Sequence, residues 1–143
     1  MKIAIGCDHG AYEYKECLKN DLIALGYEVI DFGTDSKESV DYPVFARKTA
    51  EFVAKNKDSF GIVLCTSGEG VCITANKIKG IRCGLSYNDE VASLMRRHNH
   101  ANMIAFGAKF MTYEDVLRQT KIFLTTPEEL GRHAKRVELI EKN

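Results

Sequence analysis

Residues 60–77 read FGIVLCTSGEGVCITANK, and this stretch decides the fold. Its first part, 60–65, is a continuous apolar run, which is typical of a strand buried on both faces of a sheet. Small and hydroxyl residues follow the run, and a helix is predicted over 69–77. A strand that leads through a glycine-rich loop into a helix is the repeating unit of an α/β protein.

The same alternation extends from this unit in both directions along the chain. Gly26 is typical of a helix C-terminus, and Pro43 is tolerated in a first helical turn. Pro127 is expected to begin a last helix that runs nearly to the end of the chain. The other strands are predicted over 2–7, 27–32, 81–87 and 102–107, and the other helices over 12–25, 42–56, 88–98 and 112–124. Five strand–helix repeats and an extra C-terminal helix predict an α/β fold, in which helices cover both faces of a five-stranded parallel sheet.

Composition excludes several classes of protein. The 143 residues suit one domain spanning 1–143, since no linker, repeat or low-complexity segment interrupts them. Twenty basic and twenty acidic side chains cancel, so no general attraction to nucleic acid or to an anionic membrane is expected. No apolar run reaches the length of a membrane span. Five cysteines without a CxxC pair, and an N-terminus unlike an export signal, predict reduced thiols, a cytoplasmic location and no zinc site.

Ligands of parallel sheets bind at the carboxyl ends of the strands, which points to two loops. The first strand ends in GCDHG, where Asp8 suits a helix N-cap and the adjacent His9 keeps a ligand-binding role open. The third strand ends in CTSGEG, where backbone N–H groups at a helix N-terminus can hold an oxyanion. Cys65 borders this loop, where a thiolate is stabilised and can act as a base or nucleophile. The other cysteines, at 7, 17, 72 and 83, are predicted to be buried structural residues.

Several known motifs are absent from the CTSGEG loop. Its glycines do not extend to the GxGxxG pattern of dinucleotide-binding proteins, and no Walker A lysine follows them. Val71 stands where a cysteine phosphatase would carry its arginine, and Ser67 lacks the GxSxG pattern of serine hydrolases.

Two basic segments lie later in the chain. In RRHNHAN (96–102), His98 suits a role in proton transfer, and His100 is expected to be a histidine of a surface loop. The two histidines could bind a metal as a pair, but the lack of a third nearby ligand argues against it. In GRHAKRV (131–137), Arg132 and Arg136 are four residues apart on one helix face, which suits phosphate recognition or a solvated basic face.

Taken together, these residues resemble the type B ribose-5-phosphate isomerases and their galactose-6-phosphate isomerase siblings. The similarity covers nearly the whole chain, and the order and spacing of the motifs make it specific. The matching segments are AIGCDHGAY (4–12), VIDFGT (29–34), DYP (41–43), GIVLCTSGEGVCITANK (61–77), GIR (80–82), HNHAN (98–102), AFG (105–107) and GRHAKRV (131–137).

The resemblance implies a Rossmann-like three-layer αβα sandwich and an activity. The family consists of aldose–ketose isomerases that need no metal or cofactor and interconvert ribose 5-phosphate and ribulose 5-phosphate through an enediolate. The resemblance also implies a homodimer or a dimer of dimers, with each active site built between two subunits.

Roles follow from the matching positions. Cys65 matches the thiol that moves a proton between C1 and C2, Ser67 a hydroxyl at the substrate oxygens, and His98 the residue that opens the furanose ring. His9, Arg132 and Arg136 match the phosphate end. The substrate-binding residues that the resemblance implies are Asp8, His9, Tyr42, Thr66, Gly68, Glu69, Gly70, Asn99, Lys109, Arg132 and Arg136.

The chain departs from many relatives in the anion-hole loop, which reads CTSGEG in place of CGTGVG. Thr66 replaces a glycine, and Glu69 adds an acid. Lys109 stands where relatives often carry arginine. Because Val71 occupies the position of a glutamate base found in some relatives, Cys65 is the expected base here, with Glu69 as the remaining alternative.

Two other functions remain open. One is isomerisation of a six-carbon sugar phosphate, such as allose or galactose 6-phosphate, although a ring-opening His98 with Asn99 favours the five-carbon furanose. The other is a sensor that binds a sugar phosphate without catalysis. A base such as Cys65 argues against the sensor, because binding alone needs no base.

Overall fold

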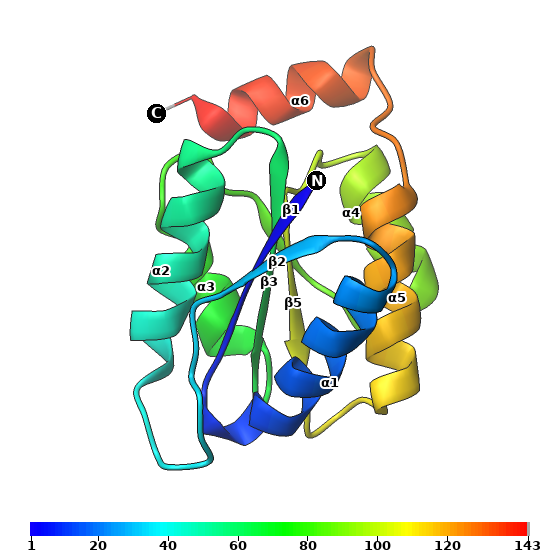
Figure 1. The fold of residues 1–143 in the computed structure, drawn as a ribbon. Coiled ribbons are helices and arrows are strands. Elements are labelled where there is room, and N and C mark those ends of the chain that lie inside the picture. Colours follow the sequence, from blue (N-terminus) through cyan, green and yellow to red (C-terminus); the bar gives the residue numbers. More distant parts are fainter. Residues whose placement is uncertain (143) are drawn as a thin grey trace.

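The computed structural model describes residues 1–142, and strands and helices alternate along them (Figure 1). Gly26 follows the first long helix with a φ of 97°, and Pro43 lies in the first turn of the next, as the sequence predicts. The elements are β1 (Lys2–Cys7), η1 (His9–Ala11), α1 (Tyr12–Ala24), β2 (Glu28–Asp31), α2 (Tyr42–Lys55), β3 (Ser59–Cys65), α3 (Glu69–Asn76), β4 (Cys83–Leu85), α4 (Asp89–Arg97), β5 (Met103–Gly107), α5 (Tyr113–Thr125) and α6 (Arg132–Glu141).

The five strands form one parallel sheet in the order β2-β1-β3-β5-β4. Cys7 pairs with Leu64, and Cys65 pairs with Gly107, so β1, β3 and β5 end at the same level. The loops after these three strands therefore meet at one edge of the sheet.

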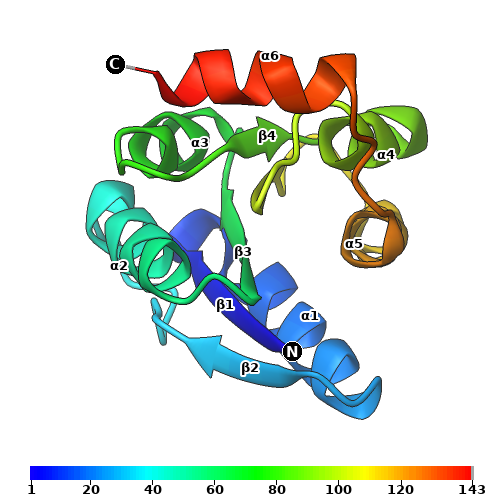
Figure 2. The same cartoon turned by 90° about the horizontal axis from the view of Figure 1, so that it is seen from above.

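Alternate strand positions form two cores, one on each face of the sheet. Ile5 and Leu64 pack with apolar residues of α1, α4 and α5, whereas Val63 and Cys65 pack with those of α2 and α3. Figure 2 shows the two sets of helices on opposite sides of the strands. The predicted three-layer αβα sandwich with a five-stranded parallel sheet is confirmed.

Two predicted boundaries are wrong. β4 covers 83–85 rather than 81–87, because the N–H of Arg82 donates to the side chain of Asn102 instead of to a neighbouring strand. The last helix begins at Arg132 rather than at Pro127. The N–H of Glu129 donates to the carbonyl of Arg97 at 3.0 Å, which holds the preceding segment as a loop against α4.

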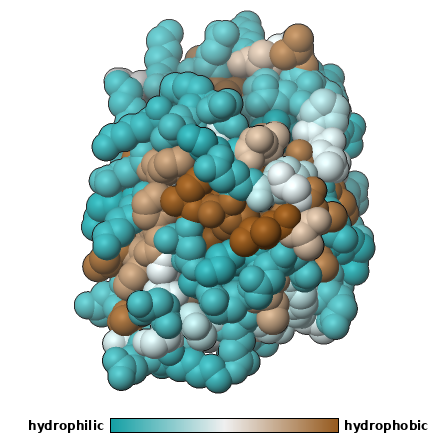
Figure 3. Space-filling model, viewed as in Figure 1, coloured by the Kyte–Doolittle hydropathy of each residue, from teal (hydrophilic) through white to brown (hydrophobic). Residues whose placement is uncertain are grey.

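α6 lies across the amino end of the sheet and along its β4 edge (Figures 1 and 2). Arg82, just before β4, forms an ion pair of 2.6 Å with Glu141 in the last turn of α6. The face seen in Figure 3 is largely hydrophilic, with an apolar patch near its centre, in the region of the edge strand β2. No helix within residues 1–142 is both long and apolar enough to cross a membrane.

Candidate active site

The loop between β3 and α3 holds the Cys65 thiol beside backbone donors. The N–H of Gly68 donates to the Cys65 sulfur at 3.2 Å, and the N–H of Glu69 donates to the Ser67 hydroxyl at 3.2 Å. The first N–H groups of α3 have no intrahelical acceptor and lie just beyond. A thiol and several backbone donors therefore share one loop, and hydrogen bonding of this kind stabilises a thiolate or another anion.

Gly68 gives this loop its shape. Its φ is 82°, a conformation that glycine adopts at little cost and other residues rarely adopt. A Cβ at this position would lie 2.8 Å from the backbone of Phe106 and Gly107, at the end of β5. The loop therefore packs directly on β5, and only glycine fits at 68.

Segments from two other parts of the chain, residues 8–10 and the start of α2, lie against the loop that holds Cys65. The side chain of Asp8 accepts a hydrogen bond from the N–H of Gly10 at 3.0 Å, so the predicted N-cap is confirmed. Gly10 lies against the hydroxyl of Thr66, and the ring of Tyr42 lies against Gly70 in the first turn of α3. The structure therefore brings Asp8 and Tyr42 to the loop that holds Cys65 and Thr66.

His9 and Lys109 border the same edge. The N–H of Lys109 donates to the carbonyl of Thr66 at 3.1 Å. Nδ1 of His9 accepts the N–H of Val40 at 3.1 Å, which leaves the Nε2–H of the neutral ring as a donor. A cavity of about 280 Å³ is lined by His9, Lys109, Lys37 and Glu13 among others, and Glu13 forms an ion pair with Lys37. Cationic and imidazole groups there suit an anion such as a phosphate.

A second group of predicted site residues lies at the opposite end of the sheet. His98 ends α4 and Asn99 follows it, before β5 begins at Met103. Arg132 and Arg136 are exposed and one turn apart on α6. Since β5 runs from this end towards the Cys65 loop, a single chain does not bring the second group to Cys65.

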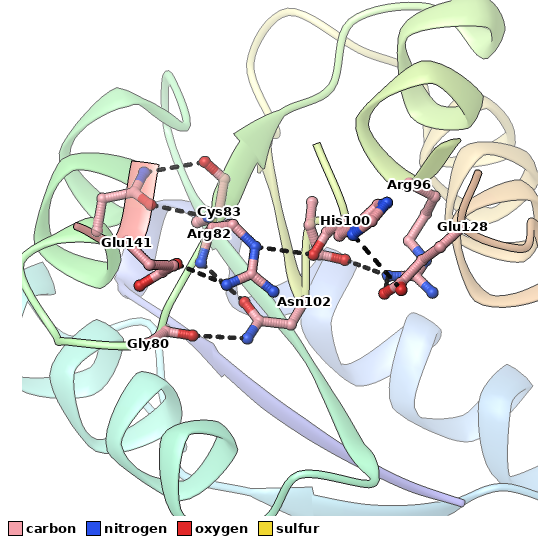
Figure 4. A network of polar contacts seen from close by, with 10 residues as sticks. Gly80, Arg82, Cys83, Arg96, His100, Asn102, Glu128 and Glu141 are labelled. Atoms are coloured by element: carbon pink, nitrogen blue, oxygen red, sulfur yellow. Dashed lines mark hydrogen bonds and ion pairs between the residues drawn. The ribbon is translucent and has the colours of Figure 1, made fainter. Parts of the chain in front are cut away.

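A network of polar contacts holds the segments around this second group (Figure 4). Nε of Arg82 donates to the carbonyl of His100 at 3.0 Å, while its Nη1 pairs with Glu141. Nη1 of Arg96 lies 3.3 Å from Glu128, which also contacts Nδ1 of His100 at 3.6 Å. The two arginines thereby fix the 98–102 loop, the 127–131 segment and α6 to one another.

The structure adds Glu129 and His133, which the sequence analysis missed. The rings of His98 and His133 stack with centroids 4.0 Å apart, and Oε1 of Glu129 lies 3.8 Å and 3.7 Å from their Nε2 atoms. Burial, together with the charges of His98 and Arg132, lowers the pKa of His133. The expectation that no third ligand lies near His98 is wrong. The four-residue spacing of Glu129 and His133 was the one feature of the sequence that could have placed these two side chains together. No sequence pattern indicated that they lie beside His98.

The other cysteines differ from one another. Cys7 is completely buried at the end of β1, and burial raises its pKa to about 12, although Lys15 and a backbone hydrogen bond oppose that effect. Cys72 and Cys83 are half-buried. Cys17 is exposed, so the prediction that it is buried is wrong. It lies on the outer side of α1, because Leu18 and Leu22 occupy the buried side of that helix.

Glu69, and Val71 at the position where some relatives carry a glutamate base, have different surroundings. Glu69 is exposed in the first turn of α3. Val71 is completely buried among apolar residues and offers no proton acceptor. Cys65 is also 95% buried, and its sulfur accepts the N–H of Gly68.

Comparisons with known proteins agree with this architecture. Residues 3–140 match the model of the Ribose/Galactose Isomerase family. The chain is 40% identical to ribose-5-phosphate isomerase B of Escherichia coli over 139 residues, which are 97% of this chain and 93% of that protein. Ribose-5-phosphate isomerase B of Clostridium thermocellum superposes with a TM-score of 0.96 at 44% identity, over 99% of this chain and 95% of the other. The Mycoplasma genitalium enzyme with bound ribulose 5-phosphate gives a TM-score of 0.95 at 34% identity, over 98% and 93%. This chain belongs to the ribose/galactose isomerase family.

Proposed function

We propose that the protein interconverts ribose 5-phosphate and ribulose 5-phosphate. The observation that carries this proposal is the Cys65 thiol, which accepts the N–H of Gly68 at 3.2 Å beside the start of α3. Isomerisation removes a weakly acidic proton next to a carbonyl, so it needs a base and donors for the oxygen that gains charge. The loop 65–70 supplies both within six residues.

Cys65 acts as the base in this account. Its thiolate takes the proton from C2 of the open-chain aldose, which gives an enediolate. The hydroxyl proton passes from O2 to O1, and the same thiol returns a proton to C1 to give the ketose. The N–H groups at the start of α3 and the Ser67 hydroxyl hold the enediolate oxygens. Asp8 and Tyr42, which border the loop, contact the sugar hydroxyls.

The phosphate is bound by the cationic residues of both groups. His9 and Lys109 line the cavity at the carboxyl edge, and Arg132 and Arg136 present two exposed guanidinium groups on α6. Charge-assisted hydrogen bonds from such groups are among the stronger contacts to a phosphate. Binding of the remote phosphate then positions the sugar for proton transfer.

A second copy of the chain completes each site. The carboxyl-edge group around Cys65 and the amino-end group around His98 lie at opposite ends of one chain, so neither group alone holds all the predicted residues. In a symmetric homodimer each subunit supplies its His98, Asn99, Arg132 and Arg136 to the other subunit's Cys65. Exposed apolar side chains beside the β4 edge, Ile73, Leu139 and Ile140, supply a surface for this contact.

His98 serves ring opening in the completed site. Ribose 5-phosphate is mostly a cyclic furanose, and opening it needs a proton on the ring oxygen and removal of the proton from the C1 hydroxyl. An imidazole can do either step near neutral pH. Asn99 lies next to His98 and supports the sugar by hydrogen bonding.

A coupled assay of ribulose 5-phosphate formation tests the function. We expect turnover of ribose 5-phosphate without added metal or cofactor, and much slower turnover of allose 6-phosphate and galactose 6-phosphate. Faster turnover of a six-carbon substrate would assign the chain to that branch of the family. Tight binding of ribose 5-phosphate without turnover would instead identify the protein as a sugar-phosphate sensor.

We also propose a cytoplasmic location, because the five free cysteines suit a reducing compartment.

A further inference from the structure

A cluster of metal-ligating side chains lies at the amino end of the sheet, among residues that the isomerase chemistry does not fully use. His98 comes from the end of α4, Glu129 from the loop after α5 and His133 from the first turn of α6. One ligand atom from each residue lies within 4.8 Å of the other two. We propose that these three side chains form a binding site for a divalent transition metal of the zinc class, and that the bound metal inhibits the enzyme.

The distances suit a zinc site once the cluster closes slightly and one imidazole ring turns towards the shared ion. Zinc binds imidazole nitrogens and carboxylate oxygens at 2.0–2.2 Å, so two ligands of a tetrahedral site lie about 3.4 Å apart. Oε1 of Glu129 lies 3.8 Å from Nε2 of His98 and 3.7 Å from Nε2 of His133. These separations are too long for hydrogen bonds and only a few tenths of an ångström longer than a metal would impose.

The surroundings of the cluster already orient its ligands. Nε of Arg97 donates to Oε2 of Glu129, which leaves Oε1 facing the two rings. The main chain of Glu129 is held as well, since its N–H donates to the carbonyl of Arg97 and its carbonyl contacts Nε2 of His100 at 2.7 Å. Both Nε2 atoms lie near Oε1 of Glu129, and because the rings of His98 and His133 stack parallel to within 4°, one ring has to turn before both lone pairs point at a shared metal ion. Hydrogen bonds that fix a ligating carboxylate raise metal affinity.

Ligand type and charge decide which metals bind. Two imidazoles and one carboxylate favour Zn²⁺, Ni²⁺, Co²⁺ or Cu²⁺, whereas Mg²⁺ requires oxygen ligands. Arg97, Arg132 and Arg136 place positive charge nearby and weaken the attraction for any cation. The affinity is therefore lower than that of a four-ligand structural zinc site, and water takes the fourth position.

The inhibitory part of the inference rests on the proposed function. A metal bound to Nε2 of His98 occupies the lone pair that ring opening would use. Inhibition should therefore be stronger with ribose 5-phosphate, which must open its ring, than with ribulose 5-phosphate, which cannot form a furanose.

Titration calorimetry of the full chain with ZnCl₂, in a phosphate-free and non-chelating buffer, tests the site directly. We expect one Zn²⁺ per chain for the wild type, and at least about tenfold weaker binding for Glu129→Gln and for His133→Asn. Glu128→Gln is the matched control, because Glu128 is adjacent in sequence but faces Arg96 and His100. Its affinity should equal that of the wild type. Equal affinities in all four proteins would overturn the site and assign the zinc to the cysteines.

Co²⁺ gives a second readout that does not depend on activity. The complex should show the visible bands of a tetrahedral site without thiolate-to-cobalt charge transfer, and His133→Asn should abolish them. A thiolate band in the wild type would overturn the proposal. Should Zn²⁺ bind as expected while ribose 5-phosphate is not turned over, the metal site stands and the proposed function fails. Zn²⁺ that binds and inhibits both reaction directions equally would overturn the inhibitory role of His98 ligation.

Discussion

Cys7 and Cys65 end neighbouring strands, and both are buried, yet their thiols have different neighbours. Cys7 is completely buried, and burial raises its pKa to about 12, so it stays protonated. The Cys65 sulfur accepts a backbone N–H from Gly68 at the start of a helix. Its position beside the glycine-rich loop and the start of α3, rather than the residue type, makes Cys65 the candidate base.

Replacing Cys65 with alanine tests that assignment. A general base contributes about 10²–10⁴-fold to rate, so kcat of Cys65→Ala should fall by at least about a hundredfold. Stability should fall by only about 1 kcal/mol, as for an average substitution, and phosphate affinity should persist. Steady-state kinetics and urea unfolding measure the two effects. Near-normal kcat would move the base to Glu69.

Thiol labelling gives an independent test of the same residue. Cys17 is exposed and would dominate the signal, so the experiment uses a Cys17→Ser background. Iodoacetamide should then modify Cys65 faster than the other cysteines, because a thiolate is the reactive form. Inorganic phosphate or ribose 5-phosphate should protect it. Modification of Cys65 at the rate of buried Cys7 would remove it from the chemistry.

His98 has a role that can be separated from proton transfer at carbon. His98→Asn should lower kcat for ribose 5-phosphate by about 10²-fold, which is the lower range for a general acid or base. Ribulose 5-phosphate should lose much less, because its open chain needs no ring opening. Both directions are measured at saturating substrate. Equal losses would exclude His98 from ring opening.

At the scale of the element, the loop that begins α3 depends on Gly68. Gly68→Ala must place a Cβ 2.8 Å from the backbone of β5 at a positive φ. We expect a loss of about 1–3 kcal/mol in stability and a large loss of kcat, since the anion-holding donors move. Gly80→Ala is the matched control, because Gly80 has a φ of 88° with nothing within 4 Å. The control should keep its kcat, and similar kcat losses in both variants would contradict the packing argument.

α1 and β2 are joined by a buried ammonium group. Nζ of Lys15 donates to both carboxylate oxygens of Asp31, at 2.9 and 2.7 Å, and to the carbonyl of Thr34 at 2.7 Å. Burial opposes protonation, yet the hydrogen bonds to Asp31 and Glu16 raise the pKa of Lys15. This contact fixes the start of the segment that carries Val40, the partner of His9, towards α2.

Lys15→Met should therefore destabilise the fold. Hydrogen bonds to charged groups contribute about 1.5–3 kcal/mol, and a loss in this range is expected because Asp31 is exposed and keeps its contact with Lys19 at 3.0 Å. Lys19→Met, on a partly exposed side chain, should cost at most about 1 kcal/mol. Urea unfolding compares the two variants. Equal losses would show that burial of Lys15 adds nothing.

The regular elements could be predicted from the sequence, because each depends on nearby residues. Continuous apolar runs predicted β3 and β5. The backbone preferences of Pro43 and Gly26 predicted the start of α2 and the end of α1. Pro127 led to a wrong start for the last helix. A proline suits a first helical turn, but its presence does not reveal that the N–H of Glu129 donates to the carbonyl of Arg97. The bounds of β4 were predicted too wide for the same reason, because the N–H of Arg82 is taken by a side chain twenty residues away.

At the scale of the whole molecule, the candidate site divides in two. The residues around Cys65 were predictable because parallel strands end at one edge of the sheet. His98 and Arg136 were singled out in their own basic segments and received their roles through family resemblance, and no periodicity indicated that they lie at the other end. Glu129 and His133 escaped prediction because only the folding of the 127–131 segment brings them to His98. Shared sites of this kind depend on contacts between distant segments, which local patterns do not encode.

The central claim is that two copies of the chain build each active site, and mixing two inactive variants tests it most directly. Cys65→Ala retains an intact amino-end group, and His98→Asn retains an intact Cys65 loop. In a symmetric dimer, unfolding and refolding an equal mixture makes half of the dimers mixed, each with one intact site of two. The account predicts that ribose 5-phosphate turnover recovers to about a quarter of the wild-type value, whereas each variant refolded alone stays inactive. Activity of the mixture equal to the mean of the separate variants would contradict it, and would mean that each chain works with its own residues alone.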